Sequence, residues 1–204
     1  MSFTEKRNKG EKKAKTIRIP TPAYLANVAL AYLGRYAATE ASFRRVLENR
    51  LRRAAMQNAV FAADRAAQKA LREAIEKLVE KYKTAGVLND AAYAEMKIGS
   101  LRRSGGSARR ISQKLQVKGV KAPIIAAAFE EEVEREGEGR ERKAALLFAK
   151  KKGLGPYRKE GARKKLDEAA QKKKDIAAFL RAGFSYDLVK EVLGADPEDV
   201  DFEV

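Results

Sequence analysis

The chain has 204 residues and a formal net charge of +16, from 44 Lys or Arg against 28 Asp or Glu. It contains neither cysteine nor histidine, which excludes disulfides, thiolate metal sites, cysteine nucleophiles and Ser-His-Asp chemistry. It also has no phosphate-binding glycine loop and no apolar run of the ~20 residues that a membrane span needs. We therefore expect a cytoplasmic, basic protein that is not an enzyme, requires no cofactor or metal and contacts no membrane.

The N-terminal part is expected to contain a basic arm followed by three helices. Residues 1–20 combine Lys, Asn and Gly with few apolar side chains, which predicts a disordered arm. Order is expected to begin at Thr21, because Thr is a good N-cap residue and the Pro that follows suits the first helical position. Thr39 is a second candidate N-cap and Gly86 a terminator. Apolar residues recur here every three or four positions, so residues 21–87 are predicted to form a three-helix unit.

The same plan recurs twice in the remaining chain. Residues 88–138 carry candidate caps at Asp90 and Ser107 and a candidate terminator at Gly119. Residues 139–194 are predicted to form a third unit that contains a Lys-rich insert. Residues 195–204 are predicted to be an acidic tail.

Two sequence offsets indicate an internal repeat. A shift of 68 residues places Thr39 on Ser107, and a shift of 64 places Gly119 on Gly183, with the apolar stripes moving along with them. A unit of this size has too little core to be robust alone. The predicted fold is therefore all-α: a tandem array of three three-helix repeats, elongated and curved. A compact helical bundle is the alternative.

The positive charge is concentrated in blocks. No acidic residue occurs between Glu95 and Glu130, although many Lys and Arg residues do, and residues 140–174 are also strongly basic. Each block alone can be a solvated helix face. Together they indicate a positive surface for nucleic acid, an acidic protein or a complex of both.

Four segments resemble the RecX family of recombination regulators: AYLGRYAATEASFRRVL, GVLNDAAYA, SLRRSGGSARRISQKLQVKGV and RAGFSYDLVKEVL. The resemblance covers the chain from about Thr21 to Leu193, and its most specific part runs from Ser107 to Val120. The GLGPYR segment at Gly153 is similar to the version in the alphaproteobacterial branch.

The resemblance implies a regulatory protein of tandem three-helix repeats without catalytic residues. Its implied partner is the filament that the RecA recombinase forms on single-stranded DNA. Binding along that filament would inhibit ATP hydrolysis, strand exchange and coprotease activity, and so regulate DNA repair and the SOS response. A monomer is expected, because such an array uses its whole face for one partner.

The charge blocks predict which side chains make this contact, which could include direct contact with DNA. Arginine suits bidentate contacts to carboxylate and phosphate groups. The residues expected to bind the partner or nucleic acid are Arg44, Arg45, Arg102, Arg103, Arg109, Arg110, Lys114, Lys150, Lys151, Lys152 and Arg158. The alternative function is a DNA- or RNA-binding helical module that does not depend on RecA.

Two further features have a functional and a structural interpretation. Aromatic residues such as Tyr32, Tyr36 and Tyr93 could stack on unpaired bases, but their helical spacing favours core packing. Tyr157 and Tyr186 are expected to be exposed, since they lie beside glycine turns. The Gly105-Gly106 pair could be a hinge between modules, but a plain interhelical turn is favoured.

Overall fold

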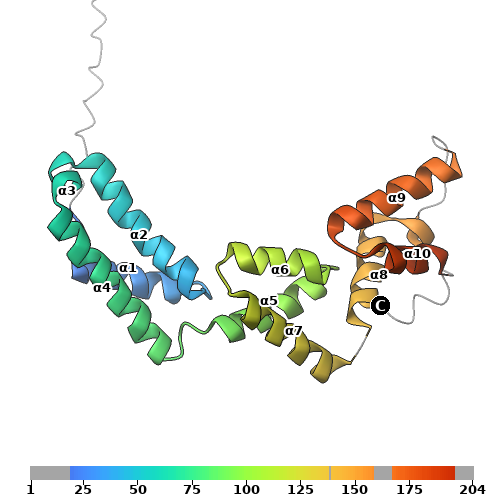
Figure 1. The fold of residues 1–204 in the computed structure, drawn as a ribbon, viewed down its shortest axis with the longest axis horizontal. Coiled ribbons are helices and arrows are strands. Elements are labelled where there is room, and N and C mark those ends of the chain that lie inside the picture. The colour runs from blue at the N-terminus through green and yellow to red at the C-terminus, as the bar shows by residue number, and fades with distance from the viewer. Residues whose placement is uncertain (1–18, 138, 159–166, 196–204) are drawn as a thin grey trace, which may run out of the picture.

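The computed structural model describes residues 19–137, 139–158 and 167–195. Most of the predicted basic arm, half of the Lys-rich insert and nearly all of the acidic tail therefore lie outside the described residues. Within them, all regular structure is helical, and the helices form an elongated, curved array rather than a compact bundle (Figure 1). None of the described helices combines the length and the hydropathy that crossing a lipid bilayer requires.

The first repeat holds one more helix than its pattern predicts. Its helices are α1 (Pro22–Leu33), α2 (Glu40–Gln57), α3 (Ala59–Ala63) and α4 (Arg65–Thr84). The extra helix α3 begins because the Asn58 side chain accepts a hydrogen bond from the Phe61 amide at 3.0 Å. The Phe61 ring is 1% exposed, so this short helix closes one end of the core.

The second and third repeats follow directly. Their helices are α5 (Asp90–Arg102), α6 (Ala108–Val117), α7 (Ala122–Glu136), α8 (Arg140–Lys152), the 3-10 helix η1 (Gly155–Tyr157), α9 (Glu168–Ala182) and α10 (Tyr186–Gly194). Each repeat buries its own apolar cluster, around Phe43 in the first, Ile111 in the second and Phe179 in the third. Such small cores need support from their neighbours.

Helices α2, α6 and α9 lie end to end along the inner side of the curve (Figure 1). The Thr39 hydroxyl, at the start of α2, donates a hydrogen bond to the Lys118 carbonyl at the end of α6, at 2.6 Å. The Ser107 hydroxyl, at the start of α6, donates to the Ala182 carbonyl at the end of α9, at 2.5 Å. Both hydroxyls also cap their own helices, so one side chain satisfies backbone groups of two repeats.

A carboxylate from the next repeat completes each junction. The Asp90 side chain accepts a hydrogen bond from the Glu40 amide at 2.9 Å, and the Glu141 side chain accepts one from the Ala108 amide at 3.0 Å. The prediction that Asp90 caps its own helix is therefore wrong. Asn89 is the N-cap of α5 and accepts from the Ala92 amide, which leaves Asp90 for the first turn of α2.

Glycine allows the helix ends to approach closely. Gly119 has φ +88° and Gly183 has φ +94°, values that L side chains rarely adopt. A Cβ atom at Gly119 would collide with Ala41, and one at Gly183 would lie 2.7 Å from the Ser107 hydroxyl. The two junctions therefore repeat the same three contacts, which gives both pairs of neighbouring repeats a common geometry.

We expect Gly119→Ala to destabilise the protein by ~2–4 kcal/mol, since the new methyl group would force the first junction apart as well as strain the backbone. Gly86→Ala is the matched control, because Gly86 has a similar φ of +71° but no neighbour within 4 Å. It should cost only the ~1–2 kcal/mol of the left-handed conformation. Urea unfolding of both variants measures the difference, and equal losses would contradict the steric role of Gly119.

Candidate partner-binding groove

Residues of all three repeats line a groove of about 990 Å³. We call it the central groove. Its wall includes the end of α1, one face of α5, one face of α6 and the end of α9. Its aromatic and charged lining residues are Tyr32, Tyr36, Tyr93, Lys97, Arg109, Arg110, Lys114, Lys118 and Arg181. Its charged lining, as far as the structure describes it, is entirely cationic.

A second cavity of about 600 Å³, the side groove, lies between the second and third repeats. It shares Arg110, Lys114 and Arg181 with the central groove and adds Lys151 and Lys152 from the end of α8. Phe148 and Leu154 supply apolar surface. No acidic side chain is found among the described residues around it, so the two cavities form one continuous cationic surface.

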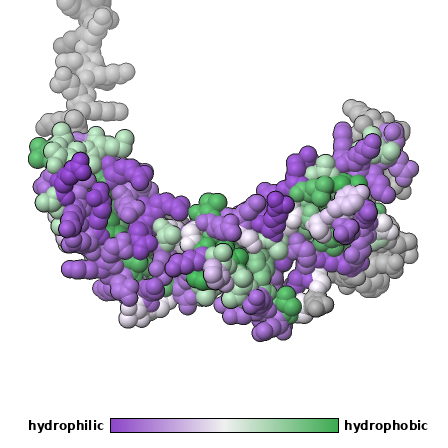
Figure 2. Space-filling view, viewed as in Figure 1, coloured by the Kyte–Doolittle hydropathy of each residue, from purple (hydrophilic) through white to green (hydrophobic). Residues whose placement is uncertain are grey.

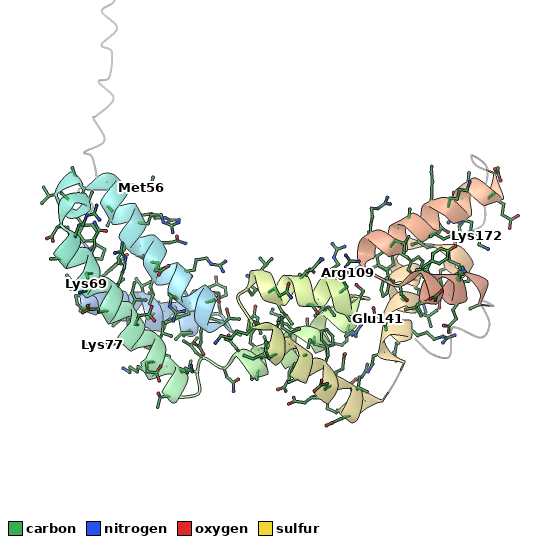
Figure 3. The ribbon with its side chains drawn as sticks, in the orientation of Figure 1. Met56, Lys69, Lys77, Arg109, Glu141 and Lys172 are labelled. Carbon is green, nitrogen blue, oxygen red and sulfur yellow. The ribbon has the colours of Figure 1, made fainter. Side chains whose placement is uncertain are left out.

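Helical periodicity explains why α6 is the centre of this surface. Ile111 and Leu115, four residues apart, are each 1% exposed and face the core of the second repeat. Arg110 and Lys114 precede them by one position and are exposed along the groove wall. Arg109 lies at the end of α6 that faces α9 (Figure 3). Hydrophilic residues cover this part of the inner rim (Figure 2).

Tyrosines form the end of the central groove next to the first repeat. The Tyr32 and Tyr36 rings lie 5.4 Å apart, and Tyr36 is 59% exposed rather than in the core. Tyr93 is 8% exposed, as its spacing predicts, and burial raises the pKa of its hydroxyl. The Lys97 ammonium lies 5.7 Å from the Tyr93 ring centre. This wall can receive an apolar or planar group beside an anion.

Five of the eleven predicted partner-binding residues line the two grooves: Arg109, Arg110, Lys114, Lys151 and Lys152. Arg103 and Lys150 lie beside them around a shallower hollow of about 320 Å³, which Lys151 also lines. The Lys150 ammonium is 5.9 Å from the Tyr157 ring centre. Partner binding by these seven residues, which the sequence predicts, therefore remains a proposal.

Two predicted residues, Arg44 and Arg45, lie on α2 outside the grooves. Arg44 makes a bidentate pair with Glu76 of α4, at 2.7 and 2.9 Å, and this pairing lowers the pKa of the Glu76 carboxyl. The Arg45 guanidinium donates to the Val117 carbonyl at 3.3 Å. Both contacts are internal, so partner binding at these positions would have to compete with them.

Arg102 is inside the molecule, which contradicts its predicted place on the binding surface. It is 8% exposed and donates to Glu132 at 3.3 Å and to the Gly106 carbonyl at 3.2 Å. It also pairs with Glu141, the residue that caps α6, and lies 5.4 Å from the Phe129 ring centre. We therefore assign Arg102 to the junction between the second and third repeats.

Arg158 is likewise a structural residue. Its guanidinium pairs with Asp175 of α9, and the two side chains are 14% and 5% exposed. Asp175 also accepts from the Gly155 amide at 3.0 Å and from Gln171 at 3.1 Å, so it anchors the GLGPYR turn onto α9. The neighbouring Tyr157 packs against the core of the third repeat and is not exposed as predicted, whereas Tyr186 is 48% exposed.

The Asp175 contacts predict an acid-sensitive third repeat. Burial raises the pKa of Asp175, but its hydrogen bonds to Arg158, Gly155 and Gln171 outweigh burial and leave the pKa below its ordinary value. The resulting stability is present above the unfolded pKa of ~3.9 and is lost as pH falls through the folded pKa. Asp175→Asn should therefore be less stable than wild type at pH 7, by an amount that shrinks below about pH 4.

Denaturant unfolding from pH 7 to pH 3 tests this expectation. Glu80→Gln is the control, because Glu80 is exposed on α4 and should leave the pH profile nearly unchanged. If the difference in free energy of unfolding between Asp175→Asn and wild type stayed constant from pH 7 to pH 3, the result would contradict this expectation.

Three groove cations, Lys97, Lys118 and Arg181, were absent from the predicted set. Lys97 has a local signal, since it lies midway between Tyr93 and Leu101 at four-residue spacing on one face of α5. Arg181 has only the repeat as a signal, because the 64-residue shift places it on Val117, at the same end of the equivalent helix. The charge blocks alone do not distinguish these residues from other surface lysines and arginines.

The Gly105-Gly106 pair forms a packed turn, in agreement with the favoured interpretation. The Gly106 amide donates to the Leu101 carbonyl at 2.9 Å. A Cβ atom on Gly105 would lie 2.7 Å from the Phe148 backbone nitrogen, so this turn lies directly against α8.

Comparisons with known proteins agree with this architecture. A family model described as the second three-helix domain of RecX matches residues 89–128. A "Regulatory protein RecX" from Myxococcus xanthus is 40% identical over 194 residues, which is 95% of each chain. Another from Agrobacterium fabrum is 39% identical over 114 residues, covering 56% of this chain and 55% of that one.

The fold is also similar to a solved structure. The crystal structure of RecX from Lactobacillus salivarius matches with a TM-score of 0.59 at 17% identity, covering 89% of this chain and 97% of that one. At this identity the likeness concerns the fold alone. These matches do not establish the predicted alphaproteobacterial subtype.

Proposed function

Since the chain belongs to the RecX family of non-enzymatic regulatory proteins that modulate RecA, we propose that it binds the RecA filament through the central and side grooves. Single-stranded DNA coated with RecA presents phosphates and protein carboxylates along one continuous path. A groove that three successive repeats line, with cations from the second and third, can follow such a path with many contacts at once. Binding there would hold the filament in a form that hydrolyses ATP and exchanges strands more slowly.

The observation that supports this proposal most strongly is that all described charged side chains lining the two grooves are positive. Arg109, Arg110, Lys114 and Arg181 line the grooves, and no described acidic side chain pairs with them. At physiological salt an exposed charge acts over only ~8 Å, so the partner must enter the groove to be attracted. Each phosphate that a cation neutralises releases counterions, which makes such binding steeply salt-dependent.

Several finer features belong to the same proposal. We infer that the protein works as a cytoplasmic monomer, that it touches the DNA as well as RecA, and that it is of the alphaproteobacterial type. The shared groove of three repeats supports a monomer, because one chain already supplies a complete binding surface. Sedimentation of the isolated protein tests the monomer directly.

The main test is the rate of ATP hydrolysis by RecA on single-stranded DNA, with and without the protein. We expect inhibition at near-stoichiometric amounts that fades as NaCl is raised from 50 to 300 mM. Unchanged hydrolysis at every protein concentration in low salt would sink the proposal.

Direct binding of nucleic acid is a second candidate, favoured by the exposed Tyr36 ring beside the groove cations. An aromatic face next to arginines is a typical platform for an unpaired base. A gel-shift series with naked and RecA-coated single-stranded DNA separates the two functions. Tight binding to naked DNA at physiological salt, without preference for the coated strand, would favour this second function.

A further inference from the structure

In the described part of the chain, no acidic side chain pairs with the cations of the two grooves. Several cations elsewhere in the chain do have acidic partners. Arg44 pairs with Glu76, Arg102 with Glu132 and Arg158 with Asp175. The groove cations instead line open cavities: Lys97, Arg109, Arg110, Lys114, Lys118, Lys151, Lys152 and Arg181. Like charges gathered this way repel, so an anionic segment that enters the grooves lowers the electrostatic free energy.

The chain carries such a segment next to its last described helix. Residues 196–204 read DPEDVDFEV, with five acidic residues and no Lys or Arg. Apolar Val200, Phe202 and Val204 alternate there with acidic residues. In an extended chain, successive side chains point to opposite sides, so Asp199, Asp201 and Glu203 would lie on one side and Val200, Phe202 and Val204 on the other. The side groove has matching surfaces, with Lys151 and Lys152 near Phe148 and Leu154.

The end of α10 is close enough for this segment to reach the side groove. Leu193 packs against Gly155, where an added Cβ would lie 2.5 Å from its Cδ2 atom. Leu154, the residue before Gly155, lines the side groove. The nine residues that follow Ala195 span up to about 30 Å when extended.

We propose that residues 196–204 bind the side groove and the adjoining part of the central groove of the same chain. There they compete with the anionic partner. A short tether holds a segment at an effective concentration of about 1 mM, so even millimolar intrinsic affinity keeps the grooves occupied for much of the time. The acidic segment therefore acts as an intramolecular inhibitor that a filament with many contacts can displace. The intramolecular contact is independent of the proposed function, whereas its regulatory consequence rests on it.

A spin label on the acidic segment tests the contact directly. The natural chain has no cysteine, so Val204→Cys gives a single attachment site for a nitroxide. In a ¹⁵N-labelled full-length chain, we expect the label to broaden the amide signals of Arg110, Lys114 and Arg181. Lys69 and Lys77 lie on α4, far along the array from the side groove, and their signals should stay sharp (Figure 3).

Two controls keep this test specific. Changing Asp196, Asp199 and Asp201 to Asn and Glu198 and Glu203 to Gln, in the full-length labelled chain, should remove most of the broadening, as should 0.5 M NaCl. In a mixture of ¹⁵N-labelled wild type and spin-labelled chain at natural isotope abundance, we expect no broadening of the amide signals. Absent broadening, equal broadening in the neutralised chain, or equal broadening on mixing would each overturn the proposal.

Inhibition of RecA supplies a separate readout of the consequence. The variant with the five acidic residues neutralised should need about two- to tenfold less protein for half-maximal inhibition. Identical potency of the two proteins would overturn the regulatory role. If neither inhibits RecA, the proposed function fails, and the spectra alone decide whether the tail binds the groove.

Discussion

Replacing Arg109, Arg110, Lys114 and Arg181 together by glutamine should weaken inhibition of RecA by roughly 10- to 100-fold. Four exposed charge contacts of about 0.35–0.7 kcal/mol each add up to about 1.4–2.8 kcal/mol, which corresponds to this range. Any one of the four replacements alone should have a small effect for the same reason. The salt dependence of inhibition should also become shallower, because fewer counterions are released. The ATP hydrolysis assay at two or more salt concentrations measures both quantities.

A variant with the same loss of charge distinguishes the groove from net charge. Arg65, Lys69, Lys77 and Lys81 are exposed on α4 and line neither groove. Their joint replacement by glutamine lowers the net charge equally and should leave inhibition within about twofold of wild type, because removing distant exposed charges changes little. If both fourfold variants lose inhibition to the same extent, long-range charge and not the groove governs binding.

Arg102→Met should lower the free energy of unfolding by ~3–5 kcal/mol, because it leaves a buried carboxylate without its cation. Glu132 is 3% exposed, and Arg102 is the cation with which it pairs. The loss should lower the melting temperature by about 10 °C for a chain of this size. Thermal unfolding followed by circular dichroism measures it. Arg103→Met is the control, since Arg103 is the exposed neighbour on the same run.

A second variant shows whether the charge or the packing at Arg102 matters. Removing both partners in Arg102→Met, Glu132→Leu replaces the buried pair by apolar groups of similar size, which is often nearly neutral. We expect this double variant to recover most of the lost stability. Glu141 is 35% exposed and keeps its hydrogen bond to the Ala108 amide. Equal stability of Arg102→Met and Arg103→Met would contradict the junction role.

Adjacent arginines show where sequence reasoning reaches its limit. Arg102 and Arg103 belong to one basic run, and both were predicted to bind the partner. Their difference depends on Glu132, thirty residues later on α7, and on Glu141 at the start of the third repeat. No local pattern contains these positions. The same reason explains why Arg158 was predicted as exposed, although Asp175 pairs with it.

The amino-acid sequence by itself determined the all-helical class, most of the helices, the caps at Thr39 and Ser107, the glycine ends and the three-part array. These features depend on neighbouring residues in the chain, through helical period, capping hydroxyls and left-handed glycines. The tertiary structure alone decided that the capping hydroxyls also join neighbouring repeats, that Tyr36 and Arg181 line one groove, and that Arg102 is buried. These features depend on contacts between segments distant in sequence, because only folding brings the charges and surfaces of different repeats together.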